Sequence, residues 1–380
     1  MRVSTLAATL TSLLVVTPAP ASAQITKAPA AKTKQAVKVE TFAKGLVHPW
    51  GLAFLPDGRL LVTERPGRVR IVGKDGTLSA AVQGLPKVYA AGQGGLLDVA
   101  VSPDFATSGL VFVSYAEPRD GSKNGTAVTR AKLVAEGNGG RLEQAQVIFR
   151  QEPSYASGNH FGSRIVFARD GSLFVTLGDR FSPRDEAQNP ANHLGKLVRI
   201  TPDGKPHAGN PKKDGWRPEI WSIGHRNVQG AALHPASGKL WTAEHGARGG
   251  DEINVPEAGR NYGWPVITYG RDYTFLKIGE GTQKSGLEQP VYYWDPSIAP
   301  SGAAFYSGDL FPEWRGSLFV GALAGQALHR LVLDGEKIVG EEVLLKDLGE
   351  RIRDVRSGPD GAIWLLTDSP EGRILRVVPR

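Results

Sequence analysis

The stretch Arg164 to Asp179, RIVFARDGSLFVTLGD, contains two apolar runs separated by a short polar turn. Asp-Gly supplies the positive backbone angle that a tight hairpin turn requires. On either side of the turn, apolar residues alternate with others, which buries one face of each strand. The stretch therefore predicts a β-hairpin, and five similar stretches occur elsewhere in the chain. They are WGLAFLPDGRLLVTE from Trp50, LLDVAVSPDFATSGLVFVSY from Leu96, GAALHPASGKLWTAEHG from Gly230, GAAFYSGDLFPEWRGSLFVGAL from Gly302 and DVRSGPDGAIWLLTD from Asp354.

Further strands flank these hairpins. A third strand follows most units, such as KLVRI from Lys196, and a fourth precedes the next unit, such as QVIFR from Gln146. Six repeats of four antiparallel strands predict an all-β fold, a six-bladed β-propeller over residues 37–380, in preference to a pair of β-sandwiches. The strand Val37 to Phe42 stands at a fourth-strand position before the first hairpin, so we expect it to pair with the C-terminal strands and close the ring. Long loops are expected at Arg180 to Trp216 and Asn254 to Pro290.

The N-terminus is typical of an exported protein. Residues 1–23 combine one arginine, a short apolar run and the small residues Ala21-Ser22-Ala23, which predicts an export signal cleaved near Gln24. Residues 24–36 mix Lys, Ala and Pro without periodicity and are expected to form a flexible linker. No stretch is long and apolar enough to span a bilayer, so we expect no integral membrane segment in the mature protein and a periplasmic or secreted location.

Composition excludes several classes of chemistry. Zero cysteines exclude disulfides, thiolate metal sites and a cysteine nucleophile. The net charge of +7 comes from 45 basic residues spread among 38 acidic ones, so we expect no nucleic-acid partner. Nicotinamide, Walker A and GxSxG motifs are absent, so redox chemistry would need another cofactor.

Polar residues precede the innermost strand of each predicted blade. Because these strands all run the same way along the propeller axis, the residues before them meet on one face, here called the mouth. The second strand of each blade returns to that face. The residues predicted there are Trp50, Gln93, Asn159, His160, Arg226, Asn227, Ser297 to Ser301, Arg351 and Arg353 from the first strands, and Asp179, Glu244 to Asp251 and Leu323 to Gln326 from the second strands.

His160 and the arginines each allow two interpretations. A lone loop histidine is usually structural, but Asp179 follows the partner strand of His160 and can accept an imidazole N–H, which fixes the tautomer. Asp179 could instead cap a turn. The three arginines of the mouth could be solvated or paired with acids, yet three guanidinium groups directed at one mouth favour a multiply anionic ligand.

The segment from Glu244 to Pro265 is rich in glycine and acidic residues. Backbone carbonyls and carboxylates are hard oxygen ligands that suit calcium, although the spacing does not match an EF-hand and a hairpin with an acidic turn would look similar. His225, beside Arg226, is predicted to point to the opposite side and to be structural. No histidine pair has the spacing of a zinc site.

Six motifs occur in order along the chain: GQGGLLDVAVSPDF, NHFGSRIVFARDGSLFVTLGDR, GHRNVQG, GGDEIN, GRNYGWP and RIRDVRSGPDG. Together they resemble the soluble aldose sugar dehydrogenases that depend on pyrroloquinoline quinone (PQQ), relatives of soluble glucose dehydrogenase. The resemblance covers essentially the whole chain after residue 37. It implies a six-bladed propeller that binds PQQ and calcium and oxidises an aldose to a lactone.

Site residues follow from the resemblance by position. His160 is similar to the base that takes the proton of the sugar C1 hydroxyl as hydride passes to the quinone, and Asp179 to the residue that orients it. Arg226, together with calcium, would polarise the quinone oxygen. The positions that match PQQ contacts are Gln93, Arg226, Asn227, Arg351 and Arg353, those that match calcium-binding carbonyls are Gly246 and Ala247, and those that match a second, structural calcium site are Glu252 and Tyr262.

Three departures concern specificity. Glucose-specific relatives have a lysine where this chain has Ala324, an aspartate where it has Asn159, and a substrate-stacking tryptophan near Asp295. These differences resemble the broad aldose branch. A calcium-dependent propeller lactonase, a sorbosone-type aldehyde dehydrogenase and a non-catalytic propeller remain alternatives. The expected partners are an aldose and an external electron acceptor, with the protein a monomer or homodimer.

Overall fold

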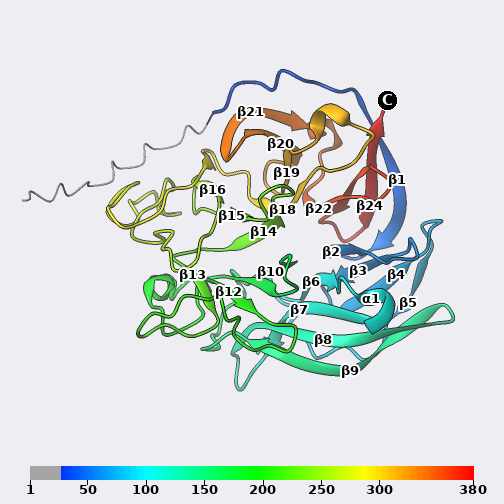
Figure 1. The fold of residues 1–380 in the computed structure, drawn as a ribbon, viewed down its shortest axis with the longest axis horizontal. Coiled ribbons are helices and arrows are strands. Elements are labelled where there is room, and N and C mark those ends of the chain that lie inside the picture. The colour runs from blue at the N-terminus through cyan, green and yellow to red at the C-terminus, as the bar shows by residue number, and fades with distance from the viewer. Residues whose placement is uncertain (1–26) are drawn as a thin grey trace, which may run out of the picture.

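The computed structural model describes residues 27–380. In this part of the chain the strands form six separate four-stranded antiparallel sheets, arranged as blades around a central axis (Figure 1). The first strand of each sheet contacts the first strand of the next, which closes a ring around the axis. The protein is therefore a six-bladed β-propeller, as the six repeats predict.

The first three blades follow the chain in order, with the first strand of each nearest the axis. A short helix, α1 (Phe105–Ser108), joins the first two strands of the second blade. The strands are β2 (Pro49–Phe54), β3 (Leu60–Glu64), β4 (Arg68–Val72) and β5 (Leu78–Ala81); β6 (Leu96–Val101), β7 (Leu110–Pro118), β8 (Asn124–Glu136) and β9 (Gly139–Arg150); and β10 (Gly162–Phe167), β11 (Leu173–Leu177), β12 (Lys196–Ile200) and β13 (Ile220–Ile223).

The last three blades repeat the pattern, and three 3₁₀ turns lie in their connections and in the β11–β12 connection. These turns are η1 (Arg184–Gln188), η2 (Pro312–Trp314) and η3 (Lys346–Leu348). The strands are β14 (Val228–Leu233), β15 (Leu240–Glu244), β16 (Asp251–Asn254) and β17 (Tyr292–Trp294); β18 (Pro300–Phe305), β19 (Leu318–Ala322), β20 (Ala327–Asp334) and β21 (Lys337–Leu344); and β22 (Ile352–Ser357), β23 (Ile363–Thr367), β24 (Gly372–Pro379) and β1 (Val37–Leu46).

The sixth blade closes the ring with strands from both ends of the chain. β1 pairs antiparallel with β24, from Val37 opposite Pro379 to Leu46 opposite Gly372. In Figure 1 the blue N-terminal strand lies beside the red C-terminal strand. The pairing predicted for Val37 to Phe42 is confirmed, and it joins residues more than three hundred positions apart.

The hydrophobic core lies between the blades. Alternating apolar residues on each sheet pack against those of the neighbouring sheet, and one buried cluster fills each of the six blade–blade interfaces. The second strands β3, β11, β15, β19 and β23 are buried along their whole length. This packing holds the inner strands, and hence the residues before them, in fixed positions.

Every innermost strand has a register shift near its start. The shift falls between Pro49 and Leu52 in β2, and at the same place in the other five inner strands. A β-bulge bends its strand and redirects side chains, and bulges are common next to functional sites. In this propeller all six bulges lie at the mouth end of the inner strands.

Residues 27–36 lie against the fifth blade. Ala30 pairs with Glu341 of β21, and Arg330 donates hydrogen bonds to the carbonyl and hydroxyl of Thr33. Ala31 is 5% exposed. The sequence predicts a flexible linker at residues 24–36. In the described part of this segment, residues 27–36, backbone hydrogen bonds to Glu341 hold the chain along the outer strand. The expected signal, residues 1–23, lies outside the described residues.

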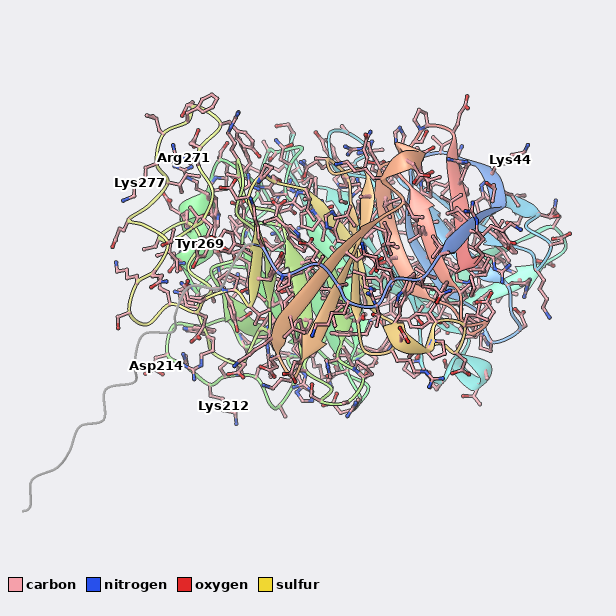
Figure 2. The ribbon with its side chains drawn as sticks, turned by 90° about the horizontal axis from the view of Figure 1, so that it is seen from above. Lys44, Lys212, Asp214, Tyr269, Arg271 and Lys277 are labelled. Carbon is pink, nitrogen blue, oxygen red and sulfur yellow. The ribbon has the colours of Figure 1, made fainter. Side chains whose placement is uncertain are left out.

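The loop between β16 and β17, residues 255–291, matches the second long loop predicted from the sequence. Figure 2 shows Arg271 and Lys277 of this loop on the opposite face of the ring from Lys212 and Asp214 of the β12–β13 connection. The first predicted loop is interrupted by β12. Within residues 27–380, no helix is long and apolar enough to cross a membrane.

Candidate active site

His160 lies directly before the inner strand β10, in the mouth. Its backbone has a positive φ of 50°, and its main-chain N–H donates to Oε1 of Gln93 at 2.9 Å. The main-chain N–H of Gln93 donates to the carbonyl of Gly158 at 2.7 Å. A positive φ is unfavourable for residues other than glycine, so such contacts are needed to hold it. Gln93, expected as a cofactor contact, supports the His160 loop in this structure.

The His160 imidazole is bound to Asp179. Nδ1 of His160 lies 2.6 Å from Oδ1 of Asp179, and the two residues are 4% and 0% exposed. Asp179 follows β11, the antiparallel partner of β10, so the hairpin brings the two residues together from 19 positions apart. This is the contact that the sequence led us to expect.

The carboxylate of Asp179 is itself held by two further donors. Nε1 of Trp264 donates to Oδ2 at 2.8 Å, and the main-chain N–H of Phe181 donates to Oδ1 at 2.8 Å. Trp264 comes from the long β16–β17 loop and is 6% exposed. The GRNYGWP motif contains this tryptophan, but nothing in its spacing indicates contact with Asp179.

The environment of His160 favours the neutral imidazole. Burial lowers its pKa below the usual range, and the positive charge of Arg226 acts in the same direction, against the hydrogen bond and the charge of Asp179. With Nδ1 donating to Asp179, Nε2 has a lone pair. Within the described residues, Nε2 has no hydrogen-bond partner. A neutral imidazole in this tautomer can accept a proton at Nε2.

Arg226 lies just before β14, close enough for its charge to act on His160. Its guanidinium donates to the carbonyl of Gly246 and, at 3.2 Å, to the hydroxyl of Tyr273, and it lies 5.2 Å from the ring centre of Trp264. Its main-chain N–H donates to Glu244 at 2.7 Å. The structure therefore fixes Arg226 between the glycine-rich loop and the long β16–β17 loop.

Arg351 and Arg353 differ in burial. Both bind Asp368, through Nη2 at 3.2 Å and 2.8 Å respectively, but Arg353 is 6% exposed whereas Arg351 is exposed. Arg353 also donates to Oε1 of Gln229 at 2.8 Å. Neither Asp368 nor Gln229 was identified from the sequence. Asp368 follows β23, the antiparallel partner of β22, so the hairpin relation that links Asp179 to His160 could have found it, whereas Gln229 lies on β14 of another blade. Because two guanidinium groups share one carboxylate, an uncompensated positive charge remains beside the mouth.

The glycine-rich loop is held by Asp251. This carboxylate accepts the main-chain N–H of Gly246 at 2.8 Å and those of Ile298 and Ala299 at 2.7 and 2.8 Å. The loop and the start of the fifth blade are thereby joined. Ala247 is 7% exposed and forms an isolated bridge with Gly249.

Glu252 and Tyr262, expected to bind a second calcium, have different surroundings. Burial and the charge of Glu244 raise the pKa of Glu252 to about 8. The hydroxyl of Tyr262 already donates to the carbonyl of Val255 at 2.8 Å and accepts the N–H of Glu257 at 2.9 Å. Among residues 27–380, no group of three or more His, Asp or Glu side chains is arranged to hold a metal.

His225 agrees with its predicted structural role. Its ring lies 2.8 Å from Ser222 and 3.0 Å from Glu244, stacks on Tyr262, and is fully buried.

Comparison with known proteins places the chain in a family. Residues 46–376 match the family model described as Glucose / Sorbosone dehydrogenase. The chain belongs to this family. It is 47% identical over 349 residues to the aldose sugar dehydrogenase YliI of Escherichia coli (strain K12), covering 90% of this chain and 93% of that one.

Solved structures agree with this assignment. The apo-form of the soluble aldose sugar dehydrogenase from Escherichia coli superposes with a TM-score of 0.87 at 47% identity, over 91% of this chain and all of that chain. The PQQ-bound aldose sugar dehydrogenase from Streptomyces coelicolor superposes with a TM-score of 0.77 at 31% identity, over 92% of this chain and 99% of that chain.

In this member of the Glucose / Sorbosone dehydrogenase family, the mouth has surplus hydrogen-bond donors. Nε of Arg226, Nδ2 of Asn227 and Nε of Arg353 are buried and have no hydrogen-bond partner among residues 27–380. Oδ1 of Asn227 accepts the N–H of Gly162 at 3.1 Å. Buried donors without partners are rare and costly in folded proteins. PQQ bears several carboxylates and two quinone oxygens, all acceptors, so the donor set fits this group.

Proposed function

We propose that the protein is an aldose sugar dehydrogenase that oxidises the C1 hydroxyl of an aldose to a lactone with PQQ and calcium. The observation that supports this most directly is the His160–Asp179 pair, which leaves Nε2 of His160 without a partner among residues 27–380. Arg226, Asn227 and Arg353 add buried donors that have no partner in the same part of the chain. The family match and the PQQ-bound relative agree with this assignment.

Each residue has a separate role in the proposed reaction. Nε2 of His160 takes the proton of the C1 hydroxyl, while Asp179 keeps Nδ1–H in place and stabilises the imidazolium that forms. Bound PQQ would supply a two-electron acceptor for the hydride of C1, so that the sugar would be released as the lactone. Gln93, Arg226, Asn227, Arg351 and Arg353 are the residues that would hold this group, the arginines through its carboxylates.

Calcium is the second part of the proposal. The main-chain carbonyls of Gly246 and Ala247 are hard oxygen donors, and they would hold the ion that polarises the quinone. The carbonyl of Gly246 already accepts from Arg226 and would bind the ion through its second lone pair. For a second, structural ion we propose Glu252 with Tyr262. Glu252 forms no ion pair within the described residues, and since the Tyr262 hydroxyl is occupied, Tyr262 would contribute its main-chain carbonyl.

The calcium proposal is tested on the apoprotein by thermal unfolding. Added Ca²⁺ should raise the melting temperature because it binds only the folded state, and chelator should reverse the shift. Glu252→Gln should reduce the shift. An unchanged melting temperature over a millimolar calcium range would reject both sites.

The N-terminus completes the proposal. Residues 1–23 would direct export and be removed near Gln24, which places the enzyme in the periplasm or medium. N-terminal sequencing of the secreted or periplasmic protein tests this directly. A mature chain that begins at Met1 would reject it.

One assay distinguishes the candidate functions. Purified apoprotein is supplied with PQQ and Ca²⁺, and reduction of an artificial dye is followed with aldoses, with sorbosone and with a lactone. Dye reduction with aldoses supports the proposal, whereas reduction with sorbosone alone favours the aldehyde dehydrogenase that the family description also allows. If no aldose or hydroxyaldehyde reduces the dye while the lactone is opened, the dehydrogenase proposal is wrong.

A further inference from the structure

The motif that carries His160 ends in a buried arginine. NHFGSRIVFARDGSLFVTLGDR begins at Asn159 and ends at Arg180, the residue directly after Asp179. In the folded hairpin the two ends of the motif meet, because Nη1 of Arg180 donates to the carbonyl oxygen of Asn159 at 2.6 Å. The loop after β11 is therefore bonded to the loop before β10 by a second contact, besides that of Asp179 with His160.

Arg180 holds the loop of His160 at several points. The side chain is fully buried, and its Nη2 donates to the carbonyl oxygen of Ser157 and to Oδ1 of Asn124, at the start of β8. Its guanidinium carbon lies 3.6 Å from the ring centre of Phe161. The residues on both sides of His160 thus contact this one side chain.

The hydrogen-bond acceptors of Arg180 are all neutral oxygens. Within residues 27–380 no carboxylate is hydrogen-bonded to it, and its Nε is buried without a partner in the same part of the chain. Burial lowers its pKa to about 9, so it stays charged at neutral pH. Burial of a charge without a bonded counter-ion costs free energy of folding. Folding stability alone therefore does not account for an arginine at this position.

Both ends of the motif have a strained backbone. The φ angle is 50° at His160 and 65° at Arg180, and residues other than glycine keep such angles only where their surroundings enforce them. Gln93 accepts the main-chain N–H of His160 at 2.9 Å, while Arg180 holds the carbonyl oxygens of Ser157 and Asn159. Removal of Arg180 takes away the donors of both carbonyls, and with them part of the support for the turn that directs the imidazole.

The positive charge of Arg180 also acts on the imidazole. Burial lowers the pKa of His160, and the charges of Arg226 and Arg180 add to this effect, whereas Asp179 opposes it. His245, directly after β15, also lies near His160, and burial lowers its pKa to about 3, so it is neutral. A neutral side chain at position 180 should therefore let the pKa of His160 rise.

We propose that Arg180 is a positioning residue for the base, whose guanidinium holds the 157–160 loop so that Nδ1 of His160 meets Asp179 and Nε2 stays available to the substrate. This inference rests on the proposed function and adds to it a residue that acts through His160. Because a misplacement of about 1 Å can cost 10²-fold in rate, we expect Arg180→Met to reduce kcat roughly 10- to 100-fold and to change KM little.

Steady-state kinetics with an aldose, PQQ and Ca²⁺ separates the fork of the guanidinium from its charge. Arg180→Met loses both, so kcat should fall and the acid limb of the pH profile should move to higher pH. Arg180→Lys keeps the charge but lacks the planar fork that reaches two carbonyls at once. It should lower kcat and leave the acid limb in place. Wild-type kcat in folded Arg180→Met would overturn the proposal.

The matched control is Arg330→Met. Arg330 is also fully buried, donates to a main-chain carbonyl, that of Thr33, and lies 5.3 Å from the ring centre of Trp314, but it belongs to the fifth blade. The control should change the melting temperature and leave kcat and the acid limb unchanged. A loss of kcat as large as that of Arg180→Met would show a general effect of removing a buried arginine and would overturn the proposal.

Nuclear magnetic resonance of the apoprotein separates this inference from the proposed function. With ¹⁵N-labelled histidine, the signals absent from His160→Gln report the tautomer and titration midpoint of His160 without substrate or cofactor. In Arg180→Met the Nδ1–H tautomer should be less populated and the midpoint higher, even if no aldose is oxidised. An unchanged tautomer and midpoint would overturn the role of Arg180. If Arg180→Met does not fold, Arg180→Lys replaces it, and wild-type kcat and tautomer there would overturn the role equally.

Discussion

The Nδ1 atom of His160 and the Oδ1 atom of Asp179 lie 2.6 Å apart, at the mouth ends of two paired strands. One hairpin therefore supplies both the proposed base and the group that orients it. Most other residues of the mouth reach this pair from different blades. The predictions below separate the role of each contact.

Replacement of His160 by alanine should remove the base without unfolding the propeller. We expect turnover to fall about 10²- to 10⁴-fold, as is typical when a general base is lost. The absorbance of bound PQQ should be retained, because the arginines proposed to bind its carboxylates are unchanged. Steady-state kinetics and the absorbance spectrum of the loaded variant measure both quantities. Unchanged turnover would remove His160 from the mechanism.

Trp264→Phe tests whether Asp179 needs its second donor. The variant keeps an aromatic ring but is smaller, and it loses the indole N–H that donates to Oδ2 of Asp179 at 2.8 Å. Hydrogen bonds to charged groups are worth about 1.5–3 kcal/mol, so kcat should fall by roughly tenfold or more while KM changes little. The freed carboxylate should also stabilise the imidazolium better, so the acid limb of the pH profile should move to higher pH.

The control for this variant is Trp221→Phe. Trp221 also donates its indole N–H, to the carbonyl of Pro256 at 3.0 Å, but it packs between the third and fourth blades away from the mouth. Equal losses of kcat in the two variants would indicate a general effect on packing rather than orientation of Asp179.

The activity should depend on the protonation of His160. Since burial and Arg226 lower its pKa, kcat/KM should rise with pH and reach a plateau below about pH 6.5, the ordinary imidazole value. The lowered pKa of His160 also affects the free energy of unfolding. As the pH falls below about 6.5, the unfolded chain binds a proton at His160 before the folded protein does. The stability that the neutral, buried imidazole contributes is therefore complete above about pH 6.5 and is lost as the pH falls further. A pH–rate profile and melting temperatures of wild type and His160→Gln measure the two effects. An acid limb above pH 7 would contradict the lowered pKa.

Gly178→Ala tests how closely the backbone after β11, which carries Asp179, approaches the backbone before β10, which carries His160. A Cβ at Gly178 would stand 1.9 Å from the carbonyl oxygen of His160, so the backbone must move. Overpacking of this kind costs about 1–3 kcal/mol, and the displacement should also reduce turnover. The matched control is Gly281→Ala, where an added Cβ meets no atom within 4 Å. Urea unfolding and steady-state kinetics compare the two variants, and equal stability would refute the predicted clash.

The sequence by itself determined the fold. Alternating apolar residues and Asp-Gly turns act over a few positions, so each hairpin is encoded locally, and six copies in order leave the propeller as the simplest arrangement. The position of His160 before the third inner strand then placed it in the mouth, with Asp179 on the partner strand. These are consequences of strand direction within a repeat, which a pattern can show.

Only the tertiary structure decided what completes the site. Trp264 reaches Asp179 from 85 positions away, and Tyr273 reaches Phe181 and Arg226, because the long β16–β17 loop crosses to the mouth. The path of a loop depends on packing against other blades rather than on its own periodicity. The same reason explains why residues 27–36, expected to be flexible from composition, lie against β21. Local pattern therefore encodes the blades, while the contacts between distant loops define the shape of the mouth.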